Sequence, residues 1–383
     1  MPTKTLESSI SLVEEPQLDI LFYPKTIIEP TGEEEKETLN VLSLFSGCGG
    51  MDLGFEGGFS VLEHSINEIL TPHFIDKKER NGFVLLKKTK FKTVFANDIL
   101  SDARNAWVNY FSKKGHRVED FYKESIVDLV KMYRSGVNVF PEKVDIVTGG
   151  FPCQDFSIAG KRNGFNSHKN HDGKLIEKET ASAETRGQLY MWMKEVIEIT
   201  QPKIFIAENV KGILSANKKE AFPLILEEFR KSGYYVTWKL LNSVDFGVPQ
   251  KRERVFIVGF KNEKHFKNFK FPTLNNIKQA TLSDVIFPES EIDPKYYFSE
   301  RAVQGLLNSN KKMNKGRAQD INQPCNTVGA HLAKVSLNST DPVLCIKGKY
   351  RRFTPREVAR IQSFPDTFKL VGSDAAQYKA LGN

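Results

Sequence analysis

The sequence VLSLFSGCGGMDLGF, residues 41–55, is the stretch that decides the fold class. Its short apolar run VLSLF is typical of a buried strand, because the glycine cluster SGCGG, residues 46–50, follows at once. A helix is expected to begin near Asp52. Glycines between a strand and a helix let backbone N–H groups approach a ligand closely, although a plain turn explains such glycines at least as often. Alone, the cluster is therefore weak evidence for a nucleotide-like ligand.

Strands and helices alternate along the chain beyond this stretch. Further strands are predicted at residues 93–97, 144–150, 203–209, 234–241 and 254–260. Helical spacing of apolar residues marks residues 103–111, 188–199 and 221–233. The alternation predicts an α/β fold: a doubly wound, mostly parallel sheet covered on both faces by helices. Ligands in such folds bind at the carboxyl ends of the strands.

The pattern weakens in three other parts of the chain. Residues 261 to about 344 are rich in Lys, Asn and Phe without a sustained period, so a second and smaller unit is expected there. Residues 60–92 and the polar stretch 162–185 look like insertions. The polar stretch is a candidate mobile loop, because it offers little to bury. Residues 1–40 are strongly acidic and are expected to form a flexible, solvated extension.

The charge is unevenly distributed over the 383 residues. The first forty residues hold nine acidic and three basic side chains, a net charge of −6, which leaves +14 for the remainder of a chain that carries +8 in total. A basic body favours a polyanionic partner such as nucleic acid, although many basic proteins bind none. The partner is therefore an expectation that needs a second line of support.

Composition also excludes several classes of protein. No uninterrupted apolar run approaches the roughly 20 residues of a membrane-spanning helix, so a protein with helical membrane spans is excluded. The four cysteines show no CxxC spacing, which argues against a disulfide framework or a zinc ribbon. We expect no metal site, and a reducing, cytoplasmic setting.

Reactive side chains follow the predicted strands. Asp98 follows the strand at 93–97, where doubly wound folds place an acid on ribose hydroxyls. Cys153, in GGFPCQDFS, follows the strand at 144–150, and a thiolate is the strongest nucleophile available at neutral pH. A lone cysteine is usually a small buried hydrophobe, but the position of Cys153 past a strand end argues against that role.

Charged residues follow the next strands as well. Glu208 ends the strand at 203–209, so its carboxyl is expected at the same edge of the sheet as Cys153, unless it is an ordinary cap or surface acid. In QKRER, Arg252 and Arg254 alternate onto one face if the segment is extended, although a solvated charge run has the same appearance. These residues together predict a site at one edge of the sheet.

Seven blocks occur in a meaningful order: LFSGCGGMDLGF, FANDI, DIVTGGFPCQDFS, PKIFIAENVKGIL, VDFGVPQKRERVFIVGF, RRFTPREVARIQSFPDTF and the terminal LGN. Together they resemble the conserved blocks of bacterial-type DNA (cytosine-5)-methyltransferases, over residues 41–383. PCQ after one strand, ENV after the next and QKRER further on make the resemblance specific. The resemblance implies the S-adenosylmethionine-dependent methyltransferase fold with a smaller target-recognition domain.

The resemblance also implies a covalent mechanism. C5 of cytosine is too weak a nucleophile to take a methyl group unaided, so in this family a cysteine thiolate first adds to C6. Cys153 matches that cysteine. Glu208 matches the acid that hydrogen-bonds N3 as a protonated carboxyl, and Arg252 and Arg254 match arginines near the base and its backbone. The target base must be swung out of double-stranded DNA, and the loop from Ser157 resembles the mobile loop that closes over it.

The implied cofactor is S-adenosyl-L-methionine. Residues matching its contacts in the family are Phe45, Gly47, Gly49, Gly50, Asp98, Ile99, Ile126, Leu189 and Asn383. One position departs from the family pattern, which has an acid followed by an apolar residue for the adenine amino group. Here the best match is Glu124-Ser125-Ile126, so the acid is absent or displaced by one.

The remaining expectations concern the later part of the chain. Residues 41–260 are expected to be the catalytic and cofactor-binding domain, 261–344 the target-recognition region, and 345–383 a return segment. Lys311, Lys312 and Arg317 are candidate phosphate contacts, and Arg356 and Glu357 are expected to be structural. No function is assigned to the cysteines at 325 and 345.

The resemblance bears on partners and on the end of the chain. Asn383 lies inside the last family block, so we expect a missing C-terminal helix and weakened cofactor binding. Either the sequence is a fragment or a complementing chain supplies the missing helix. The expected role is the protective half of a restriction-modification system, whose endonuclease would be a partner by function rather than by contact. Two alternatives remain open: a tRNA cytosine-5 methyltransferase of the same fold, and a truncated, non-catalytic DNA-binding form.

Overall fold

The computed structural model describes residues 37–66, 71–80, 82–152, 189–273, 279–308, 317–333 and 341–382. Every helix and strand described below lies in one compact unit, Thr38–Asn383. Cys153 and Asn383 lie outside the described residues, as do the acidic residues 1–36 and the polar stretch 162–185.

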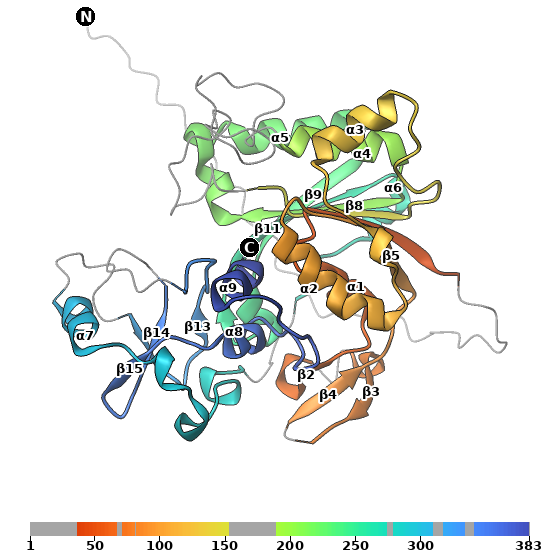
Figure 1. The fold of residues 1–383 in the computed structure, drawn as a ribbon. Helices are drawn as coiled ribbons and strands as arrows, with labels where there is room; N and C mark the ends of the chain where they lie inside the picture. The colour runs from red at the N-terminus through yellow and green to blue at the C-terminus, as the bar shows by residue number, and fades with distance from the viewer. Residues whose placement is uncertain are drawn as a thin grey trace, which may run out of the picture. The chain divides into compact units, whose positions relative to one another are not determined.

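A seven-stranded sheet forms the centre of this unit (Figure 1). Its strands, in spatial order, are β6 (Phe121–Tyr122), β5 (Phe91–Asn97), β1 (Leu39–Leu44), β7 (Ile146–Gly149), β8 (Ile204–Val210), β11 (Glu253–Phe260) and β9 (Tyr235–Asn242). The ladders from β6 to β8 are parallel, whereas β11 is antiparallel to both of its neighbours. The predicted doubly wound, mostly parallel α/β sheet is confirmed.

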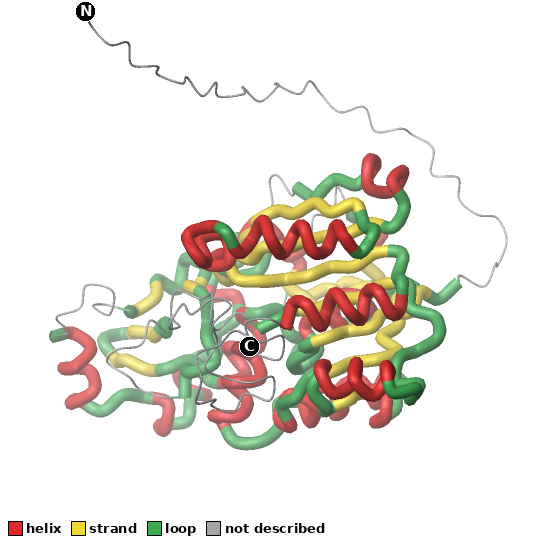
Figure 2. Tube along the Cα trace, turned by 90° about the horizontal axis from the view of Figure 1, so that it is seen from above, coloured by secondary structure: helices red, strands yellow, loops and turns green. Residues whose placement is uncertain are grey.

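Helices cover both faces of the sheet. They are α1 (Gly50–Glu56), α2 (Ser101–Phe111), α3 (Ile126–Arg134), α4 (Leu189–Thr200) and α5 (Ala221–Lys231). Figure 1 shows α3, α4 and α5 on one side of the sheet and α1 and α2 on the other, and Figure 2 shows helices packed along the strands. Two apolar clusters match these layers: one holds Val130, Val196 and Phe229, the other Leu53 and Trp107. Helix α3 is not among the helices predicted from the sequence.

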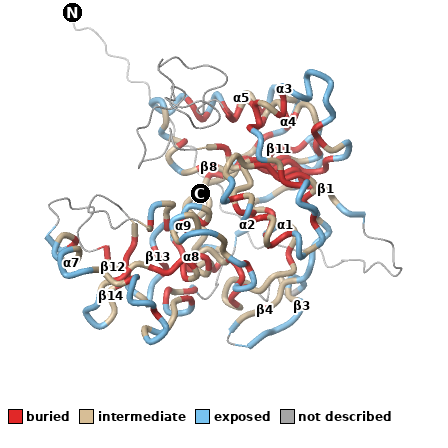
Figure 3. The backbone as a smooth tube through the Cα atoms, viewed as in Figure 1, coloured by how far each residue is buried: buried red, intermediate tan, exposed pale blue. Residues whose placement is uncertain are grey.

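The buried strands explain the continuous apolar runs of the sequence. In β1 the last four residues are buried, and all four residues of β7 are buried. Figure 3 shows this buried band between the helical layers. A parallel sheet covered on both faces needs such runs, because neither side of a strand meets water.

The segment 60–92, expected to be an insertion, forms a small sheet of its own. Its strands are β2 (Ser60–Leu62), β3 (Ile75–Lys78) and β4 (Phe83–Leu86), in the order β2-β4-β3. Val61 and Val84 are buried in it. The chain then enters β5 and returns to the central sheet.

Beyond β11 the elements are short, as the weak sequence pattern predicts. They are α6 (Glu263–Asn268), α7 (Glu300–Leu307), β12 (Ala318–Gln319), β13 (Cys325–Asn326), β14 (Val343–Ile346), β15 (Lys349–Arg351), α8 (Pro355–Ile361) and α9 (Asp374–Gly382). β13 pairs with β10 (Gln250–Lys251), and β12, β14 and β15 form a three-stranded sheet. Helix α9 contacts α2, so the end of the described chain packs back onto the central unit.

Short 3-10 turns connect many of these elements. They are η1 (Glu63–Ser65), η2 (Pro72–Phe74), η3 (Ser112–Lys114), η4 (Val118–Asp120), η6 (Lys211–Lys219), η7 (Ser243–Phe246), η8 (Leu282–Asp284), η9 (Glu289–Glu291) and η10 (Pro294–Tyr296). Among the residues that the structure describes, no helix is both long and apolar enough to cross a bilayer.

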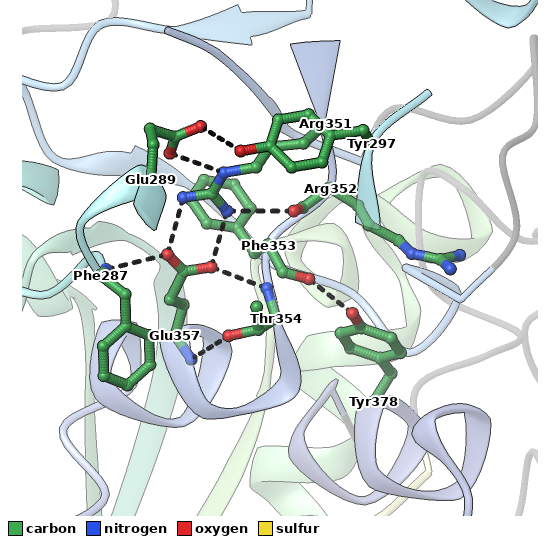
Figure 4. A network of polar contacts seen from close by, with 9 residues as sticks. All are labelled: Phe287, Glu289, Tyr297, Arg351, Arg352, Phe353, Thr354, Glu357 and Tyr378. Atoms are coloured by element: carbon green, nitrogen blue, oxygen red, sulfur yellow. Dashed lines mark hydrogen bonds and ion pairs between the residues drawn. The ribbon is translucent and has the colours of Figure 1, made fainter. Parts of the chain in front are cut away.

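A buried ion pair joins β15 to α8 (Figure 4). Arg351 donates from Nη1 and Nη2 to the two carboxylate oxygens of Glu357, at 2.8 and 2.9 Å, and both side chains are 0% exposed. Glu357 also accepts the backbone N–H groups of Phe287 and Thr354, at 3.0 and 2.7 Å. Arg351 Nε contacts Glu289 at 2.9 Å. The network therefore ties three chain segments together.

Helix α8 is fixed at both of its ends. Thr354 caps its N-terminus in a capping box with Glu357. Arg356 donates to the carbonyl oxygens of Pro365 and Phe368, at 3.3 and 2.7 Å, and thereby holds the chain that follows the helix. These contacts agree with the structural role expected for Arg356 and Glu357.

Candidate active site

The glycine cluster turns the chain sharply between β1 and α1. Phe45 and Gly47 both have positive φ angles, 52° and 55°. The N–H of Ser46 donates to the carbonyl oxygen of Asn97 at 2.8 Å, and the N–H of Asn97 donates to Ser46 Oγ at 3.1 Å. The turn is therefore fastened to the end of β5. A phenylalanine in the left-handed region is strained, and such strain is typical of functional sites.

Asp98 completes this side of the site. Its Oδ2 accepts the N–H of Gly47 at 3.0 Å, and its Oδ1 accepts the N–H of Leu100 at 2.9 Å. Each carboxylate oxygen has a second lone pair. The carboxylate is thus held in place by backbone groups at the wall of the cavity.

Gly49, which the resemblance implies to be a cofactor contact, is also needed for packing. It does not line the cavity described below. Its φ is 90°, and a Cβ there would lie 2.5 Å from Phe111 and 2.7 Å from Trp107 on α2. Glycine is required at this position because α2 packs directly against the turn.

The other side of the site is built by β8 and β11. Arg254 Nε lies 2.7 Å from Glu208 Oε1, and the two side chains are 16% and 22% exposed. The antiparallel register pairs Arg254 with Val210, which is two residues after Glu208 on β8. A Cβ on Gly150 would lie 3.1 Å from Glu208 Oε2, so the end of β7 approaches the carboxyl closely.

Residues around β10 connect this side to the later part of the chain. Gln250 is buried, and its Oε1 accepts the N–H of Val328 at 3.1 Å. Thr327 Oγ1 donates to the carbonyl oxygen of Lys251 at 2.7 Å. The N–H of Arg252 donates to Asn242 Oδ1 at 3.0 Å. Both QKRER arginines are therefore positioned by a well-bonded backbone.

One cavity of about 720 Å³ joins the two sides. Ten of the residues predicted from the sequence line it: Phe45, Gly47, Gly50, Asp98, Ile99, Ile126, Leu189, Glu208, Arg252 and Arg254. Pro152 and Gly382, the neighbours of Cys153 and Asn383, line it too. The structure thus brings together side chains that are more than 200 residues apart in the sequence.

Sequence reasoning missed several lining residues. They are contributed by the turn (Cys48), by the strand ends (Asn97, Thr148), by the segment before β10 (Phe246, Val248) and by the return segment (Gln362, Phe364, Ala380, Leu381). Most of them lie inside the quoted blocks, but their side chains are mainly apolar or amide groups without catalytic chemistry to single them out. From the return segment the sequence pointed to Asn383 alone, and the packing of α9 beside the turn adds the four residues of that segment.

The segment Glu124-Ser125-Ile126, which differs from the family pattern of an acid before an apolar residue, lies partly on the cavity wall. Ser125 and Ile126 line the cavity, whereas Glu124 does not. Ser125 is the N-cap of α3 and accepts the N–H of Val127. The carbonyl oxygen of Glu124 accepts Asn97 Nδ2 at 2.8 Å. A serine hydroxyl therefore stands at the cavity wall where the family pattern has an acid.

Two buried groups near the turn have perturbed acidity. Burial raises the pKa of the Cys48 thiol to about 12, and its Sγ donates to the carbonyl oxygen of Ala380 at 3.3 Å. Cys48 therefore stays a thiol and is unsuited to nucleophilic attack. Burial also raises the pKa of Asp52 to about 6, and Trp107 Nε1 donates to its Oδ2 at 2.7 Å. Asp52 therefore links α1, which follows the turn, to α2.

One predicted phosphate contact is wrong. Arg317 is buried, at 8% exposure, and burial lowers the pKa of its guanidinium. A side chain in this environment is not presented to a DNA backbone. Lys311 and Lys312 lie outside the described residues.

The cavity fits the expected methyl donor. A Cβ added to Gly47 would meet no atom within 4 Å, so the missing side chain leaves open space beside the backbone. Asp98 is oriented to accept hydroxyl groups, as a ribose requires. Among the described residues no cluster of three His, Cys, Asp or Glu side chains is arranged to hold a metal ion.

Comparisons with known proteins identify the family. Residues 81–383 match the family described as C-5 cytosine-specific DNA methylase. The chain is 33% identical over 371 residues to the Type II methyltransferase M.BsuRI of Bacillus subtilis, covering 91% of this chain and 76% of that protein. It is 31% identical over 371 residues to the Type II methyltransferase M.FnuDI of Fusobacterium nucleatum, covering 90% of each.

Solved structures of low sequence identity share the fold. The methyltransferase EhMeth of Entamoeba histolytica matches with a TM-score of 0.59 at 17% identity, over 91% of this chain and 94% of that one. A putative prophage-encoded DNA modification methyltransferase from E. coli matches with a TM-score of 0.56 at 20% identity, over 90% and 94% of the two chains.

Proposed function

This chain belongs to the C-5 cytosine-specific DNA methylase family, and on that premise we propose how it methylates DNA. The expected family and cofactor are confirmed: the protein is a DNA (cytosine-5)-methyltransferase that depends on S-adenosyl-L-methionine. The observation that carries the proposed mechanism is the single cavity, which has the Glu208–Arg254 pair on one wall and the glycine turn with Asp98 on the other.

The target cytosine enters the Glu208 side of the cavity after it is flipped out of double-stranded DNA. None of the reacting atoms is accessible inside a stacked duplex, and flipping costs a few kcal/mol. Cys153, which directly follows the cavity residue Pro152, supplies the thiolate that adds to C6. C5 then carries the electron density that accepts the methyl group. Loss of the C5 proton restores the ring double bond and expels the thiolate.

Glu208 neutralises the ring during the addition step. In its protonated form it donates a hydrogen bond to N3 of the cytosine, because charge develops there when the thiolate adds to C6. Arg254 holds the carboxyl at 2.7 Å and thereby orients it. Arg252, on the same wall, binds the base oxygen O2 or an adjacent phosphate.

The glycine side of the cavity binds the methyl donor. Phe45, Gly47 and Gly50 surround it with backbone groups, and Asp98 accepts its ribose hydroxyls. When bound there, S-adenosyl-L-methionine supplies the methyl group. Ile99, Ile126 and Leu189 contribute apolar contacts. Asn383 is proposed as a further contact on the basis of the resemblance alone.

The wider role follows the relatives. Those relatives are named Type II methyltransferases, and we extend to this chain the protection of host DNA in a bacterial restriction-modification system, in the cytoplasm. Residues 41–260 act as the catalytic domain and 261–344 as the target-recognition region, with 345–383 closing the cavity. The boundary at 344 falls inside β14.

Transfer of tritium from methyl-labelled S-adenosyl-L-methionine to mixed-sequence DNA tests the mechanism. We expect transfer by the wild type, and none by Cys153→Ser. A denaturation-resistant adduct with DNA containing 5-fluorocytosine should form only when Cys153 is present, because fluorine replaces the proton whose loss releases the enzyme. Transfer that survives Cys153→Ser overturns the covalent step, and transfer to tRNA in place of DNA overturns the substrate.

A further inference from the structure

A short turn after β8 has an unusual backbone. Asn217, Lys218 and Lys219 have successive φ angles of 45°, 55° and 77°. The first two have ψ angles of 53° and 31°, and the N–H of Glu220 donates to the carbonyl oxygen of Asn217 at 3.0 Å. Residues 217–219, called the lysine turn below, thus form a left-handed turn without any glycine. L-amino acids visit this region as single residues rather than in series, because the side chain crowds the backbone.

Other left-handed residues of the described chain have ordinary explanations. Gln201 directly follows α4, and Ser363 follows the C-cap residue of α8, where left-handed residues commonly end helices. Lys347 precedes Gly348 in the two-residue turn of the β14–β15 hairpin, which requires positive φ at both positions. Phe45 lies in the active-site cavity. The lysine turn, which joins the kinked η6 to α5, differs from these because three successive non-glycine residues are left-handed, where a helix end or a hairpin needs one or two.

The lysine turn lies at the active-site edge of the sheet. The chain leaves the carboxyl end of β8, where Glu208 is located, forms η6 and enters α5 (Figure 1). Because α5 returns along the sheet before β9 begins, its first residues lie at the carboxyl edge of β8. Ligands of such sheets bind at that edge.

The turn is anchored on both sides. Before it, Ile213 is fully buried, and Lys211 Nζ lies 2.9 Å from the carboxylate of Glu253, at the start of β11. After it, Ala221 and Phe222 are buried in the first turn of α5. Residues 217–219 are exposed between these anchors. These anchors on both sides therefore hold residues 217–219 in their strained backbone conformation.

The charge presented by the turn indicates its ligand. Within the part of the chain that the structure describes, neither Lys218 nor Lys219 forms an ion pair. A backbone that holds two adjacent ammonium groups in a strained conformation at the edge of a DNA-modifying site is suited to neighbouring phosphates.

We propose that the lysine turn is a phosphate clamp, in which Lys218 and Lys219 contact the DNA backbone beside the flipped cytosine. The proposal rests on the proposed function, because it requires double-stranded DNA as substrate. These contacts position the duplex and do not read its sequence. The left-handed backbone is retained because it fixes the direction of both ammonium groups, at a cost in stability.

A glycine substitution separates the charge of the lysine turn from its backbone strain. Lys219→Gly removes one ammonium group and also removes the penalty of a side chain at a φ of 77°. It should raise the melting temperature, by roughly 2 °C, while weakening DNA binding. Lys218→Gln removes the other charge and keeps the strain. A turn with a purely structural role would gain stability on Lys219→Gly without any change in DNA binding.

The salt dependence of DNA binding tests the clamp. Binding of the full chain to a mixed-sequence duplex is measured between about 50 and 200 mM KCl for the wild type, Lys218→Gln, Lys219→Gly and the double variant. Each lysine removed should lower the slope of log K against log salt by about 0.9. Lys264→Gln is the matched control, because α6 follows β11 at the opposite edge of the sheet, where Phe260 pairs with Ile204.

The outcomes are distinct. An unchanged slope in the double variant overturns the clamp, as does an equal decrease for Lys264→Gln. A lower melting temperature for Lys219→Gly overturns the assignment of strain. A wild type that transfers methyl groups to DNA but shows an unchanged slope in the double variant refutes the clamp alone. A wild type that transfers none to DNA refutes the proposed function and the clamp with it.

Discussion

Two arginine–glutamate pairs in this protein have the same chemistry and opposite surroundings. Arg351 and Glu357 are 0% exposed, and the Glu357 carboxylate accepts four donors (Figure 4). Glu208 and Arg254 are about one fifth exposed on the wall of the cavity, and the contact at 2.7 Å joins one arginine nitrogen to one carboxylate oxygen. A carboxylate whose oxygens are occupied by four donors can only hold the fold. Among the described residues Glu208 has one ionic contact, so its carboxyl can still take up the proton that we propose it shares with the substrate.

The comparison also separates stability from activity. Breaking a buried ion pair leaves an uncompensated charge and costs several kcal/mol. A partly hydrated pair contributes little to stability, because water replaces the lost partner. The Arg351–Glu357 pair should therefore dominate in unfolding experiments and the Glu208–Arg254 pair in kinetic ones.

Glu208→Gln should have the largest effect, and on activity alone. A glutamine cannot act as an acid at N3, so methyl transfer should fall about 10²–10⁴-fold. The free energy of unfolding should change by less than about 1 kcal/mol. Steady-state tritium transfer and urea unfolding measure the two quantities. A variant that loses several kcal/mol of stability would place Glu208 in the same class as Glu357 and break the comparison.

Glu357→Ala should have the reverse signature. Among the described residues it leaves the buried Arg351 guanidinium with Glu289 as its remaining ionic partner, so the free energy of unfolding should fall by about 3–5 kcal/mol. Chemical denaturation with circular dichroism detection measures the loss. Exposed Glu263, which pairs with Lys267 on α6, offers the control Glu263→Ala, with an expected loss below about 1 kcal/mol. Equal losses in the two variants would contradict the role of burial.

Asp52 is a third case, a buried carboxyl group whose hydrogen-bond donor is the neutral indole of Trp107 rather than an arginine. Burial raises its pKa to about 6, whereas an unfolded chain releases the proton near 3.9. The folded protein therefore binds this proton more tightly, so the contribution to stability rises as pH falls from about 6 to 4 and is lost as pH rises through the same window.

The difference between wild type and Asp52→Asn isolates this contribution. Relative to the variant, the wild type should gain about 2 kcal/mol of unfolding free energy between pH 7 and pH 4. Urea unfolding at a series of pH values provides the measurement. Parallel pH profiles for the two proteins would show that Asp52 does not titrate in this range.

Arg254→Lys should have the smallest effect. It preserves the positive charge but loses the planar guanidinium that orients Glu208, so methyl transfer should fall about tenfold, with stability unchanged. Arg230→Lys, at the far end of α5, is the matched control. Full activity in Arg254→Lys would mean that charge alone, without orientation, is sufficient at this wall.

Local sequence was enough to predict the central sheet and one side of the site. The run that became β7 and the last four residues of β1 are buried on both faces, so their apolar character appears without any knowledge of neighbours. β5 and β8 are only partly buried, but their runs are apolar enough to be predicted as strands. Asp98 and Glu208 were found because each stands at the carboxyl end of such a strand. Helix α3 was missed although its boundaries carry local signals, the N-cap Ser125 and the positive-φ Gly136 that follows its end.

The sequence by itself determined the fold class, the family and most of the residues around the cavity, because strand ends and motif blocks are local signals. Only the tertiary structure decided which charges are saturated and which stay available. It buried Arg317, turned Gly49 toward α2 and closed the cavity with Gln362 and Leu381. Burial and hydrogen-bond saturation depend on atoms brought from distant parts of the chain, and no local pattern of residue types records them.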